Sequence, residues 1–316
     1  MSEPNSDLDE FAQIAALFRP LTRGAPEAFG LLDDAAAIAS RPGYDLVVTK
    51  DAMVAGVHFE VGAPPDLVAK RLMRANLSDL AAKGAEPYGY LLMTAWPADF
   101  NLAARRAFAR GLDEDGQEFG VVLLGGDTVS MPGPLTLSMT MFGWVPSGKM
   151  IPRSGARLGD LLAVSGPIGD GWLDWAPGRG LTDRRWLTQP FRLAQPRLDL
   201  RHGLRRHATA SADVSDGLIA DAGHIAKASG LGLDIDLDRL PLSDAAQAWL
   251  ATQDDRAEGL LTLACGGDDY EVVCTVTPES ATALGLPVIG EVTGSGLVVR
   301  MGSRRLEPGP GGWRHG

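Results

Sequence analysis

Six aspartates stand out in this chain because carboxylates in such settings could bind divalent metal ions. Each lies in a short motif beside small or apolar residues, next to an expected strand, turn or helix: Asp34, Asp51, Asp79, Asp127, Asp213 and Asp216. Mg²⁺ binds carboxylates and keeps other positions for water and for substrate phosphates. Carboxylates of this kind in both halves of the chain therefore indicate a polyphosphate substrate.

Taken one at a time, these aspartates also have structural interpretations. The pair at 33–34 is typical of a turn. Asp216 or Ser215 could cap the helix that follows them, and Asp79 could pair with Lys83 one helical turn later. The metal hypothesis rests on the whole set rather than on any single member.

The first half of the chain has the mixed pattern of an α/β domain. Residues 8–18 are predicted to form an amphipathic helix with Phe11, Ile14, Ala15 and Phe18 on one face. Strands and helices then alternate: a strand from Asp45, a helix over 66–83, a strand over 89–96, a helix over 101–118, a short strand over 121–124 that ends in GGD, and a strand over 135–145.

A segment rich in Pro, Gly and basic residues follows Pro146 and predicts a domain boundary. The second half repeats the mixed pattern, with strands over 161–165 and 233–237, a helix over 216–229, and strands near Val272, Val288 and Leu297. The stretch 178–196 has no clear period and is predicted to be a long loop. We therefore expect two α/β domains, 1–147 and 148–316.

Composition and charge narrow the class of protein. The chain has 316 residues, 45% of them apolar and 22% charged, which is typical of a globular protein. Its 40 acidic and 29 basic residues give a net charge of −11, which disfavours binding to nucleic acid. No apolar run approaches the roughly 18 residues of a membrane span. Two cysteines fit a reducing compartment, so we expect a cytoplasmic protein that binds no membrane.

Three familiar site patterns fail. The segment GWVPSGKM at 143–150 nearly matches a phosphate-binding loop, but Met150 stands where a hydroxyl should bind Mg²⁺. A helix should also follow, and Pro152 prevents one from starting cleanly. No GxGxxG follows a strand, and the five histidines have no zinc-ligand spacing. Neither a Rossmann site nor a zinc centre is expected.

The order of the motifs resembles the thiamine-monophosphate kinase family, within the ATP-binding superfamily that includes aminoimidazole ribonucleotide synthetase and selenophosphate synthetase. The resemblance runs from about Phe11 to Trp313. The motifs that carry it are DDAA (33–36), DAMVAGVHF (51–59), NLSDLAAKGAEP (76–87), LLGGDT (123–128), GWVPSGK with RSGARLGD (143–160), DVSDGLIAD (213–221) and GGDDYEV (266–272).

The resemblance implies a fold and a reaction. The fold class is α/β (α+β), with an N-terminal mixed-sheet domain that forms a homodimer and a C-terminal α/β domain that closes over the ATP cleft. The reaction passes the γ-phosphate of ATP to thiamine monophosphate, giving thiamine diphosphate, the last step of its biosynthesis. Because the acceptor oxygen is already anionic, no residue is expected to act as a general base.

The resemblance also assigns roles to residues. Several Mg²⁺ ions around the triphosphate would be held by Asp34, Thr49, Asp51, Asp79, Asp127, Asp213 and Asp216. ATP would contact Gly126, Asp127, Arg153 and Ser215. Thiamine monophosphate would contact His58, Asp268 and Trp313, the last through a cation–π interaction with the thiazolium ring. Plain structural roles remain open for His58, Arg153, Asp268 and Trp313.

Three positions and one segment depart from the family's usual pattern. Leu32 replaces a glycine before the aspartate pair, and Lys50 replaces a threonine before Asp51. Asp268 replaces a glutamate, and GPIGDGWLDWAP at 166–177 carries tryptophans where small residues are usual. A lysine beside a metal cluster should weaken one Mg²⁺ site or contact phosphate itself, unless it points outward.

Two rival functions remain at this stage. The first is an ATP-dependent ligase or synthetase of the same superfamily, although selenide chemistry would need a reactive N-terminal cysteine that this chain lacks. The second is a diverged paralogue that takes another acceptor or only binds nucleotide. Lys50 and Leu32 are the features that would support it.

Overall fold

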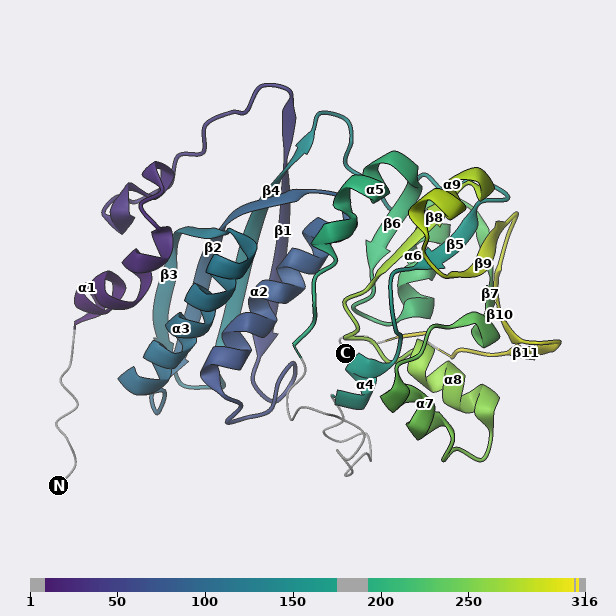
Figure 1. Ribbon diagram of the computed structural model, residues 1–316. Coiled ribbons are helices and arrows are strands. Elements are labelled where there is room, and N and C mark those ends of the chain that lie inside the picture. The colour runs from purple at the N-terminus through teal and green to yellow at the C-terminus, as the bar shows by residue number, and fades with distance from the viewer. Residues whose placement is uncertain (1–8, 175–192, 310, 313–316) are drawn as a thin grey trace. The chain divides into compact units, whose positions relative to one another are not determined.

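The computed structural model describes residues 9–174, 193–309 and 311–312 (Figure 1). These residues divide into two compact units. Unit 1 consists of the described residues within Met1–Leu80 and Glu86–Ser147, and unit 2 of those within Ala81–Ala85 and Gly148–Gly316.

Unit 1 contains a four-stranded mixed sheet in the order β1-β4-β2-β3. Its strands are β1 (Tyr44–Val54), β2 (Glu86–Pro97), β3 (Val122–Met131) and β4 (Thr136–Pro146). The strand β4 is antiparallel to both of its neighbours, whereas β2 and β3 are parallel. A parallel pair needs a long crossover, and α3 (Leu102–Phe119) supplies it.

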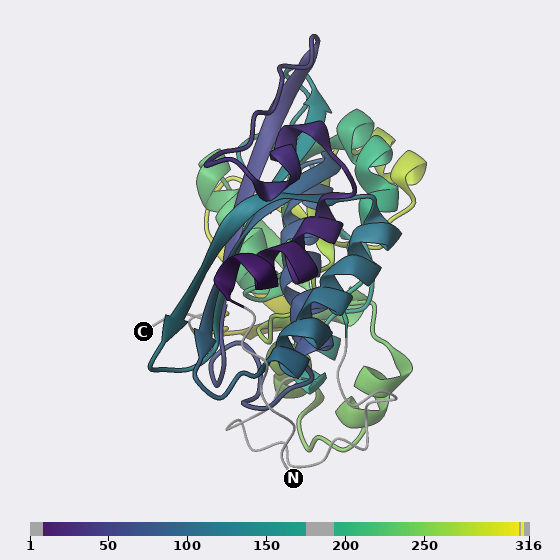
Figure 2. The same cartoon turned by 90° about the vertical axis from the view of Figure 1, so that its left-hand side faces the viewer.

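Two helices, α2 (Pro65–Ala82) and α3, lie side by side along one face of this sheet (Figures 1 and 2). The side chain of Asn101 caps the start of α3, and Gly120 ends it in a left-handed conformation. The alternation along β1 separates the two faces: Val47 and Met53 are buried toward the helices, whereas Val48 on the other face is 54% exposed.

The N-terminal segment consists of short, irregular helices: α1 (Glu10–Gln13), a π-helical turn η1 (Ile14–Phe18), and the 3₁₀ turns η2 (Arg19–Thr22) and η3 (Pro26–Leu31). A continuous amphipathic helix was expected here. Phe18 is buried as predicted, but Phe11 is 79% exposed. The wider π turn shifts the direction of the side chains, so the face predicted from a regular period is not kept.

Unit 2 contains a seven-stranded mixed sheet in the order β11-β10-β7-β9-β5-β8-β6. Its strands are β5 (Leu161–Val164), β6 (Ala208–Asp213), β7 (Gly232–Asp236), β8 (Val272–Val276), β9 (Val288–Thr293), β10 (Leu297–Met301) and β11 (Arg304–Leu306). The pair β7 and β10 is parallel and the other pairs are antiparallel.

Both faces of the larger sheet carry a core. Leu162 and Val273 belong to the core packed on α6 (Leu218–Ser229), α7 (Asp244–Leu250) and α8 (Arg256–Ala264). Their neighbours Ala163 and Cys274 face the core of α5 (Arg201–His207) and α9 (Pro278–Leu284). Short turns of helix complete the unit: α4 (Asp170–Asp174), η5 (Leu198–Leu200) and η6 (Leu237–Arg239).

Outside the N-terminal segment, the predicted elements are present within the described residues, with two differences. The strand expected to end before GGD continues as β3 to Met131, and β6, α5 and α7–α9 had not been predicted. Most of the stretch 178–196 lies outside the described residues. Across the described residues, no helix combines the length and the apolar character needed to cross a membrane.

Candidate active site

Three of the predicted metal ligands meet where β1 crosses α2. Thr49 and Asp51 are two residues apart in β1, so both side chains point to the helix-covered face. The Thr49 hydroxyl donates a hydrogen bond to Asp79 Oδ2. Lys83, the alternative partner considered for Asp79, donates to the carbonyl oxygen of Ser211 at 2.5 Å.

The Asp51 carboxylate is poorly satisfied in this position. Its Oδ2 atom is buried and has no hydrogen-bond partner among the described residues. Burial and the neighbouring Asp79 carboxylate raise the pKa of Asp51 to about 7. A buried anionic oxygen without a donor is costly unless a cation compensates it, so this cluster fits a divalent metal ion.

A second group of carboxylates lines a cavity of about 730 Å³ on the opposite face of the sheet. Asp33, Asp34 and Asp127 contribute to its wall, together with Gly126 and Lys50. The Asp33 carboxylate accepts a hydrogen bond from the Asp34 amide at 2.8 Å, and both residues lie in a bend of the chain. Asp34 is an exposed carboxylate at the cavity.

Gly126 and Asp127 lie within β3 rather than in a turn after it. A Cβ atom on Gly126 would lie 1.9 Å from the carbonyl oxygen of Leu92 in β2. The close approach of β2 and β3 therefore requires glycine at this position, whether or not a ligand binds there. The continued strand brings the exposed Asp127 side chain to the cavity.

In unit 2, the DVSDG segment forms a loop between β6 and α6. Asp213 is the last residue of β6 and is buried, whereas Ser215 and Asp216 are half-buried. Asp221, in the first turn of α6, accepts hydrogen bonds at Oδ2 from the amides of Ser215, Asp216 and Gly217 at 3.1–3.2 Å.

The alternative interpretation, in which Asp216 or Ser215 caps α6, is therefore not supported. Gly217 occupies the cap position and makes no side-chain cap. Asp221 fulfils that role from inside the helix, because its short side chain reaches back to three amides that lack helical partners. The Asp216 carboxylate therefore does not cap α6.

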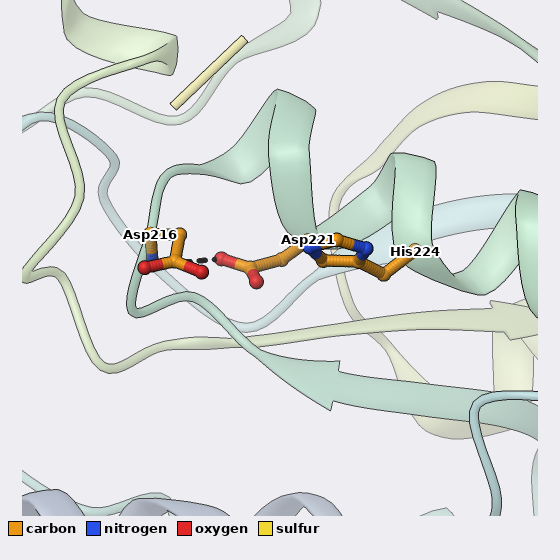
Figure 3. A group of neighbouring side chains, drawn as sticks. All are labelled: Asp216, Asp221 and His224. Atoms are coloured by element: carbon orange, nitrogen blue, oxygen red, sulfur yellow. Dashed lines mark hydrogen bonds between the residues drawn. The ribbon is translucent and has the colours of Figure 1, made fainter. Parts of the chain in front are cut away.

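Asp221 sits in a charged neighbourhood (Figure 3). Burial, followed by the Asp216 carboxylate, raises the pKa of Asp221 to about 7, while the backbone amides and the Arg153 guanidinium oppose that rise. Ligand atoms of Asp216, Asp221 and His224 lie within 4.8 Å of one another. His224 is exposed and comes from the same helix as Asp221. These three side chains are close enough to share one cation.

The GGDD segment packs directly on this loop. The Asp268 amide donates to the Ser215 carbonyl at 2.8 Å, and Gly267 comes so close that a Cβ there would lie 2.6 Å from the same oxygen. Asp268 adopts a φ of 61°, a left-handed conformation that is unusual outside glycine. Such backbone strain is often found at functional sites.

The two aspartates of GGDD differ in role. Asp269 is buried and accepts hydrogen bonds from the amides of Gly169 and Gly171 at 2.9 Å each, so it holds the start of α4. Asp268 is only half-buried. Asp269 therefore has a structural role, and the substrate prediction for Asp268 stays a prediction.

His58 has a structural contact of its own. Its Nδ1 atom accepts a hydrogen bond from the Val54 amide at 3.1 Å, so the ring proton is on Nε2 when the imidazole is neutral. The structural interpretation of His58 is thus supported for one nitrogen, and its contact with substrate stays a prediction. Trp313 lies outside the described residues.

Sequence reasoning missed the supporting residues Asp221 and Asp269. Neither residue was assigned a role from the motifs. Each holds a loop in place by accepting hydrogen bonds from backbone amides. An acidic residue in the first turn of an expected helix is a signal for such a role, and it was present in the sequence DGLIAD.

Two family models match the chain in sequence. Residues 32–145 match the N-terminal domain of AIR synthase related proteins, and residues 157–302 match the C-terminal domain. With the mixed sheets and the carboxylate loops, these matches define an AIR synthase related protein of the α+β class, as expected.

Curated relatives narrow the class. The chain is 54% identical to the thiamine-monophosphate kinase of Caulobacter vibrioides, over 97% of this chain and 91% of that protein. It is 35% identical to the thiamine-monophosphate kinase of Escherichia coli K12, over 85% and 83%. The chain belongs to the thiamine-monophosphate kinase family, a family of ATP-using kinases.

Solved structures agree. The thiamine-monophosphate kinase of Stenotrophomonas maltophilia K279a matches with a TM-score of 0.77 and 35% identity, over 92% of this chain and 96% of that one. A structure described as AaThiL complexed with AMPPCP and TMP matches with a TM-score of 0.73 and 26% identity, over 96% and 97%. The hydrogenase maturation protein HypE, at 17% identity and a TM-score of 0.76, shares the fold.

Proposed function

We propose that this protein transfers the γ-phosphate of ATP to thiamine monophosphate. An anionic oxygen of the acceptor phosphate forms a bond to the γ-phosphorus as the bond to the β,γ-bridging oxygen breaks. The products are thiamine diphosphate and ADP. The main support is the 54% identity to a thiamine-monophosphate kinase over nearly the full chain, together with a related structure described with AMPPCP, an ATP analogue, and TMP.

The structural observation that carries this proposal is the buried, unpartnered Oδ2 of Asp51 beside Asp79. Two carboxylates against one another in a poorly solvated position favour binding of a divalent cation. A regulatory protein that binds Mg²⁺ with its nucleotide could use the same pair of carboxylates. Kinase activity has more support than a diverged paralogue because of the 54% identity to a thiamine-monophosphate kinase over 97% of this chain.

Mg²⁺ is the metal that this set of oxygen ligands fits best. The residues proposed to hold it are Thr49, Asp51 and Asp79 in one cluster, Asp34 and Asp127 at the cavity, and Asp213 and Asp216 in unit 2. Bound Mg²⁺ would reduce the repulsion between the two polyanionic substrates. In the first cluster, the Thr49 hydroxyl holds the Asp79 carboxylate and the pairing of β1 with β4 fixes the backbone of Asp51.

Contacts to the nucleotide are proposed for Gly126, Asp127, Arg153 and Ser215. In unit 2, Arg153 is exposed and close enough to Asp221 to influence its pKa, which places a guanidinium near the Ser215 loop. A guanidinium can bind two phosphate oxygens at once. Asp221 holds the Ser215 amide in a fixed orientation.

Contacts to the acceptor are proposed for His58, Asp268 and Trp313. The thiazolium ring carries a positive charge, so the half-buried carboxylate of Asp268 would offset it. His58 Nδ1 accepts a hydrogen bond from the Val54 amide, so the contact proposed for His58 would place the substrate beside a ring held at the end of β1. No side chain is proposed as a general base, because the attacking phosphate oxygen is already ionised.

We also propose a homodimer in the cytoplasm, with residues 1–147 as the dimerisation domain and 148–316 as the domain that completes the ATP site. The uncovered face of β1 supports dimerisation, since it exposes Leu46 at 39% and Val48 at 54%. Apolar side chains gathered on an open sheet face commonly mark an interface. Both cysteines are free, as expected in a reducing compartment.

The experiment that tests the function is an acceptor panel. Purified protein is incubated with ATP and Mg²⁺ and with thiamine monophosphate, free thiamine, or no acceptor, and products are identified by mass spectrometry. We expect thiamine diphosphate only with the monophosphate and only with metal. ATP that binds but stays unchanged with every acceptor would favour the nucleotide-binding paralogue instead.

A further inference from the structure

Lys50 lies between two proposed metal ligands in sequence, yet it faces the other side of the sheet. Thr49 and Asp51 point toward α2, and alternation along β1 turns Lys50 to the uncovered face. The lysine therefore does not lie beside the Asp51 and Asp79 cluster. It lines the cavity formed by Asp33, Asp34 and Asp127.

The Lys50 ammonium is held by a hydroxyl rather than by a carboxylate. Its Nζ atom donates to Ser138 Oγ at 2.8 Å, and that hydroxyl in turn donates to the main-chain oxygen of Asp51 at 3.0 Å. This is the one hydrogen bond that Lys50 Nζ makes within the described part of the chain. An ammonium group has three donors, so two remain for a ligand.

Lys50 is also the one basic residue among the described residues that line this cavity. The other charged groups there are the carboxylates of Asp33, Asp34 and Asp127. A lysine placed to neutralise them would form an ion pair, whereas this one is anchored to β4 through Ser138. The Lys50 ammonium is therefore a fixed positive charge in the wall of a cavity whose carboxylates could bind metal ions.

We propose that Lys50 Nζ replaces one divalent cation in the nucleotide complex. It would donate directly to a phosphate oxygen at the Asp34 and Asp127 side of the cavity, where a threonine at this position would leave room and a hydroxyl ligand for a further metal ion. Lys50 is thus a binding residue that sets the metal stoichiometry of the reaction. This inference rests on the proposed function, since it takes ATP as the ligand.

The test compares the number of Mn²⁺ ions bound per chain in the presence of saturating AMPPCP. Free Mn²⁺ is counted by electron paramagnetic resonance for the wild type, Lys50→Thr, Lys50→Arg and Lys227→Met. Lys227 is exposed on α6, so its variant controls for the loss of one positive charge. We expect Lys50→Thr to bind one more Mn²⁺ than the wild type, and both Lys50→Arg and Lys227→Met to match the wild type.

A second measurement does not depend on counting metal. At a fixed, low Mn²⁺ concentration, calorimetry should give an AMPPCP Kd on the order of tenfold weaker for Lys50→Met than for the wild type, because a charge-assisted hydrogen bond is lost. The Lys227→Met variant should keep the wild-type Kd. Lys50 is exposed at an open sheet face, so these variants are expected to fold, which thermal melting checks.

An equal Mn²⁺ count in the wild type and in Lys50→Thr would overturn the inference, as would an unchanged Kd in Lys50→Met. Either result with normal AMPPCP binding by the wild type would leave the proposed kinase function intact. A wild type that binds no AMPPCP with Mn²⁺ would contradict both the proposed function and the role of Lys50.

Discussion

Asp51 in β1 and Asp79 in α2 bring two carboxylates together from opposite elements of unit 1, and the burial of Asp51 together with this neighbour raises its pKa to about 7. Thr49 binds Asp79 through its hydroxyl, but Asp51 Oδ2 has no donor among the described residues. The fold therefore holds a destabilised charge at the position where the account places a metal ion.

Asp51→Asn should separate activity from stability. The amide cannot replace a charged metal ligand, so we expect at least a hundredfold loss of kcat with ATP and thiamine monophosphate. Removal of a buried, repelled carboxylate should leave the melting temperature in EDTA unchanged or higher. Parallel losses of melting temperature and activity would instead indicate that Asp51 is a structural residue.

The same carboxylate predicts a pH dependence of stability. Its pKa is about 7 in the fold against 3.8 as the ordinary value, so the folded state binds more protons between these values. Below about pH 4, Asp51 is protonated in both states and does not lower the free energy of unfolding. Above about pH 7 it is ionised in both states, and the loss in the free energy of unfolding reaches its full value of roughly 4 kcal/mol.

The measurement is urea unfolding of the metal-free wild type and of Asp51→Asn at several pH values. The stability of the wild type relative to the variant should fall as the pH rises from 4 to 8. Asp221 has a raised pKa as well, and it is present in both proteins, so the difference isolates Asp51. A difference that stays constant with pH would contradict the assigned pKa.

Gly126 and its neighbour Gly125 form a matched pair. A Cβ on Gly126 would lie 1.9 Å from the Leu92 carbonyl oxygen, whereas a Cβ on Gly125 would meet the movable side chain of Leu91 at 3.3 Å. We expect Gly126→Ala to lower the free energy of unfolding by about 3 kcal/mol or to abolish folding, and Gly125→Ala to cost less than 1 kcal/mol. Equal effects would argue against the tight packing of β2 on β3.

Asp221→Ala should loosen the loop that carries Ser215 and Asp216. Three amides lose their common acceptor, so we expect a loss of about 2–3 kcal/mol in unfolding free energy and a raised KM for ATP. Asp221→Asn keeps an acceptor oxygen and should lose less. Lys227→Ala, an exposed change on the same helix, serves as the control. A KM for ATP that does not change in Asp221→Ala would remove this loop from the nucleotide site.

Much of the fold could be predicted from the sequence because the patterns were strong. The helix over 66–83 corresponds to α2 within one residue at each end, and the strand expected from Asp45 starts one residue after β1 does. The short elements α7–α9 were missed, since a turn or two of helix carries little periodicity. The end of β3 was misplaced because glycines in GGD indicate a turn by composition, whereas here they allow two strands to pack closely.

The candidate site was predictable in its chemistry but not in its geometry. Residue types and motif order indicated which aspartates matter, but not that Lys50 and Asp51 face opposite sides of β1. That separation depends on which face the helices cover, a property of the packed sheet. The supporting roles of Asp221 and Asp269 likewise depend on backbone amides that only the folded loops bring together.

The central claim is transfer of the terminal phosphate of ATP to thiamine monophosphate, and a radioactive label tests it most directly. ATP labelled with ³³P at the γ-position is incubated with the protein, Mg²⁺ and thiamine monophosphate, and the products are separated by chromatography. We predict that the label appears in thiamine diphosphate, with one labelled molecule for each ADP formed. Label found only in inorganic phosphate, or remaining in ATP, would contradict it.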